Sequence, residues 1–157
     1  MSKEIPLTQG AVTIVDDTDY DWLNQWSWYL STGGYAQRSV YTGSGYTTIF
    51  MHRVILKASA GVEVDHTSRD CLDNRRVNLR LCTGAQSSMN RAKTERKCSS
   101  KYKGVSWDRY RWAAYIYKEY VKRHLGRFKC EEDAARAYNE AAKELFGEFA
   151  VLNEVPQ

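Results

Sequence analysis

Residues 131–147, EEDAARAYNEAAKELFG, constrain the fold more than any other segment of this chain. The segment opens with three acidic residues, which favour the positive end of a helix dipole, and closes with Gly147 as a C-cap. Its apolar residues recur at steps of three and four and form one stripe: Ala134, Ala135, Tyr138, Ala141, Ala142 and Leu145. Because most of these side chains are small, the pattern predicts a helix that lies close against a sheet.

Three strands are expected before this helix, over residues 102–107, 111–118 and 122–128. In RWAAYIYK (111–118), alternation places Trp112, Ala114 and Ile116 on the face toward the helix. The outer face then carries Arg111, Ala113, Tyr115 and Tyr117, joined by Lys122 and His124 from the next strand. The C-terminal part is therefore predicted to be a three-stranded antiparallel sheet packed on one helix.

Positive charge is concentrated in the same part of the chain. The whole protein has a net charge of +4, yet residues 91–129 carry +10 and residues 130–157 carry −5. Basic side chains interleaved with aromatic ones suit a nucleic-acid surface, because cations meet phosphates and rings offer flat contacts.

The N-terminal part reads as a mixture of short strands and helices. Strands are expected over 11–17, 27–31, 33–41, 47–50, 61–66 and 77–83, and helices over 18–26, 51–58 and 85–95. Gly33-Gly34 predicts a hairpin, Thr18 or Asp19 is expected to cap the first helix, and Thr83 the last. His52, on the second helix, is expected to pack or to form a hydrogen bond.

Polar residues cluster at the end of the strand 61–66 and in the loop that follows. Hydrolysis of a phosphodiester needs a base that deprotonates water and a cation that stabilises charge on the phosphate and the leaving oxygen. His66 titrates near neutral pH and suits the base, and a turn at His66 would leave Asp65 for the metal. A carboxylate with amide or water oxygens favours Mg²⁺, or Mn²⁺, over zinc.

The C-terminal segment resembles an AP2 DNA-binding domain. The features in register are YKGV (102–105), WAA (112–114), Leu125-Gly126, Phe128, the AARAYNEAA run (134–142) and Gly147 followed by Ala150, Leu152 and Asn153. The resemblance implies that the sheet lies in the major groove of duplex DNA. Carried over by position, it implies DNA contacts from Lys103, Ser106, Arg109, Arg111, Tyr115, Tyr117, Lys122 and His124.

The N-terminal segment resembles the HNH endonucleases of phages and mobile introns, through MHRVIL, VDH, LDNRRVNLR and CTGAQSSMN. An HNH domain followed by an AP2 domain is the order found in free-standing homing endonucleases. The resemblance implies a hairpin and a helix that clasp one divalent metal ion. It assigns Asp65 to the metal, His66 to the general base, and Asn78 to a bond across the loop that orients His66.

One position departs from the HNH pattern. The resemblance calls for Asn or His nine residues after Asn78, where Ser87 stands. Ser87 itself, Asn90 one helical turn later, or a water molecule could complete the metal site. The alternative is that metal affinity is damaged and the protein is a DNA-binding regulator that cuts poorly.

These observations predict an α+β protein with an HNH domain over 1–94, a linker over 95–101 and an AP2-like domain over 102–157. The expected partner is double-stranded DNA, with RNA binding as another open class, and the protein is expected to act as a monomer or weak dimer. The four cysteines are scattered without a CxxC pair, so structural zinc and disulfides are not expected. No signal-like or membrane-length apolar run is present, and we expect a cytoplasmic protein, in the host cell if phage-encoded.

Overall fold

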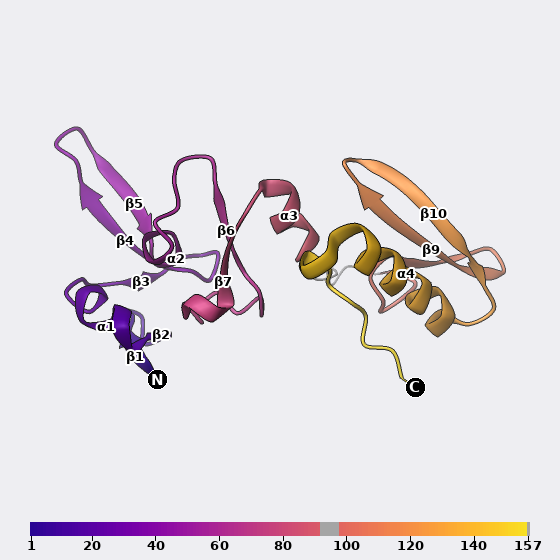
Figure 1. The fold of residues 1–157 in the computed structure, drawn as a ribbon, viewed down its shortest axis with the longest axis horizontal. Coiled ribbons are helices and arrows are strands. Elements are labelled where there is room, and N and C mark those ends of the chain that lie inside the picture. The colour runs from indigo at the N-terminus through magenta and orange to yellow at the C-terminus, as the bar shows by residue number, and fades with distance from the viewer. Residues whose placement is uncertain (92–97, 157) are drawn as a thin grey trace. The chain divides into compact units, whose positions relative to one another are not determined.

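Short antiparallel pairings build the first part of the chain. The computed structural model describes residues 1–91 and 98–156, and the chain divides into two units, Met1–Ser87 and Ser88–Gln157 (Figure 1). Residues 95–97 of the predicted linker lie outside the described residues, and the helix predicted to reach residue 95 ends at Met89. None of the described helices is long and apolar enough to cross a membrane.

The first unit begins with a strand pair that the sequence pattern only half revealed. β1 (Ser2–Pro6) pairs antiparallel with the predicted strand β2 (Val12–Asp16). β1 was not predicted because it has no regular alternation: Ile5 is its single buried residue, and charged Lys3 and Glu4 precede it.

The first helix starts earlier than predicted. α1 spans Asp17–Leu23, so its N-cap position is Asp16, and the capping role predicted for Thr18 or Asp19 is wrong. The reason is tertiary: Asp19 is buried and accepts two hydrogen bonds from the Arg76 guanidinium, each 2.7 Å long.

A three-stranded antiparallel sheet follows, in the order β3–β4–β5. β3 (Tyr29–Leu30) and β4 (Ala36–Tyr41) form the hairpin predicted at Gly33-Gly34, and β5 (Tyr46–Phe50) pairs with β4. The short helix α2 (Met51–Ile55) comes directly after β5. The β4–β5 hairpin extends away from the neighbouring elements of its unit (Figure 1).

The last elements of the unit carry the polar residues singled out above. β6 (Glu63–His66) pairs antiparallel with β7 (Leu79–Cys82), and the 3-10 turn η1 (Arg76–Asn78) precedes β7. Helix α3 (Gly84–Met89) begins at the predicted cap, because the Gln86 N–H donates to the Thr83 hydroxyl and the Gln86 side chain accepts from the Thr83 N–H. Behind these elements lies one apolar core: Ile5, Leu7, Val15, Leu23, Trp28, Ala36, Met51, Ile55 and Leu79.

The second unit has the predicted architecture. Strands β8 (Val105–Asp108), β9 (Arg111–Lys118) and β10 (Val121–Phe128) form an antiparallel sheet in the order β10–β9–β8. Helix α4 (Glu131–Phe146) packs on it through Ala134, Ala135, Tyr138, Ala141, Ala142 and Phe146, and the short turn η2 (Gly147–Phe149) follows. The α+β class, with a three-stranded sheet on one long helix, is confirmed.

Gly104 shows how closely helix and sheet approach. Its φ is +75°, and a Cβ built there would lie 2.1 Å from the Tyr138 ring and 2.5 Å from the Tyr115 carbonyl oxygen. The Gly104 carbonyl also accepts from the Tyr115 N–H at 2.7 Å, which fixes the backbone in this position. No side chain therefore fits at residue 104.

Gly104→Ala is expected to destabilise the second unit by about 2–4 kcal/mol, from left-handed backbone strain together with overpacking. Gly45→Ala is the control, because Gly45 has open space around it and no positive φ; it should change stability by less than about 0.5 kcal/mol. Urea unfolding followed by circular dichroism measures both. Equal midpoints for Gly104→Ala and the native chain would contradict the close packing.

Candidate active site and nucleic-acid interface

The β6–β7 pair presents Asp65 and His66 on opposite faces. Asp65 stands opposite Arg80 and His66 opposite Leu79 in the strand register. Both residues are buried, with exposed fractions of 8% and 4%. His66 is the last residue of β6, and the turn expected at this point follows it, closed by a 2.9 Å bond from the Arg69 N–H to the His66 carbonyl.

A chain of hydrogen bonds fixes the orientation of the His66 ring. The Thr13 hydroxyl donates to the Leu72 carbonyl at 2.7 Å and accepts from the Asn74 amide nitrogen at 2.8 Å. This leaves the Asn74 Oδ1 facing His66 Nε2 at 3.2 Å. An amide oxygen only accepts, so Nε2 donates and Nδ1 carries the lone pair in the neutral ring. His66 is thereby held in one tautomer.

Asn74 is the orienting residue that sequence reasoning missed. Asn78 does bond across the loop, as predicted: its Oδ1 accepts from the Ser68 N–H at 2.8 Å and its Nδ2 donates to the Asp73 carbonyl at 2.7 Å. It closes the loop, whereas Asn74 contacts His66 directly. The signal available in the sequence was a second Asn in LDNRRVN, four residues before Asn78.

Two aromatic side chains pack against His66. The His52 ring lies edge-on to it, with centroids 5.1 Å apart, and the Tyr35 ring lies 5.9 Å away. His52 packs as expected, but its Nδ1 is buried without a hydrogen-bond partner. Phe50 and Tyr35 pack on His52 at 5.5 and 5.2 Å.

Burial keeps both imidazoles neutral. It lowers the pKa of His52 to about 3, and the neighbouring His66 and Arg53 act on this pKa in the same direction. Burial also lowers the pKa of His66, although the bond to Asn74 and the nearby carboxylates oppose the shift. A neutral His66 at pH 7 has the protonation state that a general base requires.

Asp65 lies in a different environment, paired with an arginine. Its Oδ2 accepts from Arg80 Nε at 2.9 Å and from Arg80 Nη2 at 2.7 Å. Two arginines of the loop before β7 also bind carboxylates: Arg75 pairs with Asp73 and Arg76 with Asp19. The Asp65 carboxylate would therefore bind a metal ion only in competition with Arg80.

Ser87 lies in helix α3, soon after Cys82 at the end of β7. Burial raises the pKa of the Cys82 thiol and Asp65 and Glu63 raise it further, whereas Arg80 and the Ser87 backbone N–H lower it. Asn90 is buried and belongs to the second unit. The roles of Ser87 and Asn90 as metal ligands stay predictions.

The ligand types around Asp65 determine which metal ions this part of the first unit could bind. In residues 1–91 and 98–156, no three His, Cys, Asp or Glu side chains group as a metal site. One carboxylate with hydroxyl, amide and water oxygens is nevertheless a hard-ligand set, which Mg²⁺ accepts because it commonly retains several waters. The residue types therefore fit a hard divalent ion, and the role of Asp65 as its ligand stays a prediction.

In the second unit, four predicted DNA-contact residues lie together. Lys122 and His124 stand opposite Tyr117 and Tyr115 in the β9–β10 register. The Lys122 ammonium lies 3.6 Å from the Tyr115 ring centroid, and the Tyr115 and His124 rings are 5.0 Å apart. Ser106 lines the same surface pocket as Tyr115, Tyr117 and Lys122.

The remaining predicted contacts lie at the edges of this face or away from it. Arg109, with φ of +57°, and Arg111 flank the β8–β9 turn, where both are exposed. Lys103 differs from the expectation: its ammonium donates to the Met89 carbonyl at 2.9 Å and to the Arg91 carbonyl at 2.6 Å. These carbonyls compete with phosphate for Lys103.

Comparison with known proteins identifies the family. The chain is 32% identical over 152 residues to an uncharacterized HNH endonuclease of Acanthamoeba polyphaga mimivirus, covering 94% of this chain and 77% of that protein. The chain belongs to the HNH endonuclease family. No family model matches it, and no solved structure matches it.

About half of this HNH family member also matches AP2 proteins of plants. It is 38% identical over 79 residues to a candidate AP2/ERF and B3 domain-containing protein of Oryza sativa, covering 50% of this chain and 25% of that protein. It is 32% identical over 87 residues to an AP2-like ethylene-responsive transcription factor of Arabidopsis thaliana, covering 54% of this chain and 20% of that protein. The resemblance to an HNH endonuclease with an AP2-like region is confirmed.

Below pH 6.5 the unfolded chain gains a proton at His52 that the folded unit does not take up until about pH 3. The free energy of unfolding should therefore fall as the pH is lowered through this range. His52→Gln should reduce the loss between pH 7 and pH 5 by about 2 kcal/mol. Urea unfolding of both proteins at the two pH values measures this, and equal losses would contradict a buried neutral His52.

The two lysines give a matched test of the HNH protein's sheet. Lys122→Met should make the slope of log K against log salt shallower by about one, because one phosphate contact is lost. Lys103→Met should leave that slope unchanged, since its ammonium is bound to carbonyls. Fluorescence anisotropy with a labelled DNA duplex at several salt concentrations measures both. Identical slopes for the native chain and Lys122→Met would show that Lys122 does not contact a phosphate.

Proposed function

We propose that this HNH family member is a metal-dependent endonuclease that cuts double-stranded DNA and locates its site with the AP2-like sheet. The observation that carries the proposal is the Thr13–Asn74–His66 chain, which holds a buried neutral imidazole in one tautomer. A general base must present its lone pair to the water, and this chain of bonds places the lone pair on Nδ1.

In the proposed reaction, His66 Nδ1 takes a proton from the attacking water. The resulting imidazolium is stabilised by the Asn74 amide oxygen on Nε2 and by the charges of Asp65, Asp70 and Asp73. Asn78 keeps the loop closed, so the ring does not have to reorganise during proton transfer.

Asp65 would hold the divalent ion, with Ser87 or water completing the set. The bound ion supplies positive charge at the phosphate and at the leaving 3′-oxygen. Arg80 already neutralises Asp65, so the carboxylate must share its charge between the guanidinium and the ion. This competition is expected to keep metal affinity modest.

One such site per chain favours nicking of a single strand, with double-strand cleavage if two chains act together. The arrangement of an HNH unit before an AP2-like unit supports a homing role on phage or other mobile DNA. Action in the cytoplasm of the host cell is part of the same proposal.

A second function has its own support. Ser87 in place of Asn or His, together with the Arg80–Asp65 ion pair, favours a DNA-binding regulator that has lost efficient cleavage. The two functions predict opposite behaviour for one substitution. Ser87→Asn should leave an active nuclease about as active, but should restore cutting to an inactive one.

The test is conversion of a supercoiled plasmid that carries the protein's own genomic neighbourhood to relaxed circles, with Mg²⁺, Mn²⁺ or EDTA. The native chain should nick only with a divalent ion, and His66→Ala should lower the rate by at least about 100-fold, as expected for loss of a general base. Thr67→Ala is the control, because this exposed neighbour should keep full activity.

Three outcomes are informative here. Nicking that survives His66→Ala overturns the assignment of the base. Cutting by Ser87→Asn but not by the native chain selects the regulator. Absence of cutting in both proteins, with every divalent ion, rejects the nuclease.

A further inference from the structure

The β4–β5 hairpin has two faces of different character. One face carries Tyr29, Gln37, Ser39, Tyr41, Tyr46, Thr48 and Phe50, according to the register of β3, β4 and β5. We call this the hydroxyl face. Tyr29 and Ser39 share a hydrogen bond of 2.8 Å on it, and it contains no charged side chain.

The opposite face of the hairpin is tied to its own unit. The Arg38 guanidinium lies 4.1 Å from the Trp26 ring centroid and 5.5 Å from that of the buried Trp28. Ile49, on the same side, packs against the apolar core. The hydroxyl face is therefore the one left for an outside partner along most of its length.

The root of the hydroxyl face adjoins the candidate catalytic imidazoles. Phe50, its last residue, packs on His52 at 5.5 Å, and His52 packs on His66 at 5.1 Å. Tyr35, just before β4, contacts both histidines. A substrate held at His66 therefore meets the beginning of this face.

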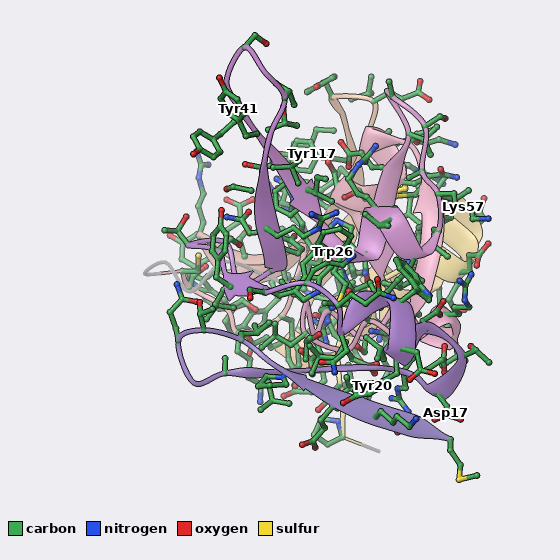
Figure 2. All side chains as sticks on the ribbon, turned by 90° about the vertical axis from the view of Figure 1, so that its left-hand side faces the viewer. Asp17, Tyr20, Trp26, Tyr41, Lys57 and Tyr117 are labelled. Atoms are coloured by element: carbon green, nitrogen blue, oxygen red, sulfur yellow. The ribbon has the colours of Figure 1, made fainter. Side chains whose placement is uncertain are left out.

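The far end of the hairpin exposes two aromatic rings. Tyr41 and Tyr46 are 62% and 79% exposed, with ring centroids 5.4 Å apart. Figure 2 shows Tyr41 on the projecting hairpin, with its side chain directed away from the ribbon. Five residue steps separate Ala36 from Tyr41, so the tip lies about 17 Å from the root at about 3.3 Å per residue.

The charge pattern indicates the class of partner. Between Asp21 and Glu63 the sequence contains no Asp or Glu, although the chain has 19 such residues, whereas Arg38, Arg53 and Lys57 fall in this interval. A surface that approaches phosphates must avoid carboxylates, and hydroxyl and amide groups can bond both phosphate oxygens and base edges.

We infer that the hydroxyl face of the β4–β5 hairpin is a second DNA-binding surface, which holds the duplex on one flank of the cleaved bond. The inference rests on the proposed function for the position of that bond. Its reach of about 17 Å corresponds to about five base pairs at 3.4 Å each. The AP2-like sheet would then supply one part of the total footprint and the hairpin another.

Thr47 and Thr48 provide a matched test, because they are consecutive exposed residues of β5 on opposite faces. Thr48→Asp places a carboxylate on the hydroxyl face and should weaken binding to a labelled duplex from the genomic neighbourhood about tenfold. Thr47→Asp makes the same charge change on the other face and should bind within about twofold of the native chain. Circular dichroism establishes that both variants are folded.

Hydroxyl-radical footprinting with Tyr41→Ala/Tyr46→Ala gives the second readout. Protection should retract by about five base pairs on one side only, while the rest of the footprint remains. Equal affinities for Thr47→Asp and Thr48→Asp, with an unchanged footprint, overturn the inference. If the Tyr41→Ala/Tyr46→Ala variant sediments differently from the native chain but binds DNA equally well, the inference is overturned, and the hairpin is instead a contact between copies of the chain.

Cleavage separates the two hypotheses. If the native chain nicks DNA and both threonine variants bind and nick equally, the hairpin inference fails and the nuclease stands. If the native chain never nicks but Thr48→Asp still weakens binding, the nuclease fails and the DNA-binding hairpin stands.

Discussion

The attachment of the loop 67–78 to strand β2 is the constraint on which the candidate site depends. The Ile14 N–H donates to the Leu72 carbonyl at 2.9 Å, and the Asn74 N–H donates to the Ile14 carbonyl at 2.7 Å. Between these backbone bonds, Thr13 binds the Asn74 side chain, which in turn binds His66. A strand from the start of the chain thus sets the orientation of an imidazole more than fifty residues later. Since Val15 of the same strand is fully buried, the support for His66 is anchored in the core.

The same unit separates two chemical environments across one strand pair. His66 lies among aromatic rings beside an amide and is neutral because it is buried, whereas Asp65 is paired with Arg80. Adjacent residues on a strand point to opposite faces, so the sequence DH places a base and an anion side by side without letting them neutralise each other.

Under the proposals made here, the two units would bind DNA through different surfaces. The β9–β10 face combines Lys122 with packed aromatic rings, whereas the β4–β5 hairpin carries hydroxyl groups and lies in a sequence interval without carboxylates. A cationic face supplies affinity that depends on salt, and a neutral polar face supplies contacts that depend on fit. An endonuclease with both could bind DNA generally and still position one bond.

The sequence by itself determined the secondary structure of the second unit, the Asp65-His66 pair at a strand end, and the family. Those features are local: the stripe of α4, the alternation of β9 and the spacing of polar residues are all written in short segments. Only the tertiary structure decided that Asn74 orients His66, that Arg80 pairs with Asp65, that Asp19 binds Arg76 rather than capping a helix, and that Lys103 binds carbonyls. Each of these joins polar groups whose partners are chosen by which strands and loops pack together. A short polar side chain can form a hydrogen bond with many different groups, so the local sequence does not determine its partner. The packing of the core does, because it determines which strands and loops become neighbours.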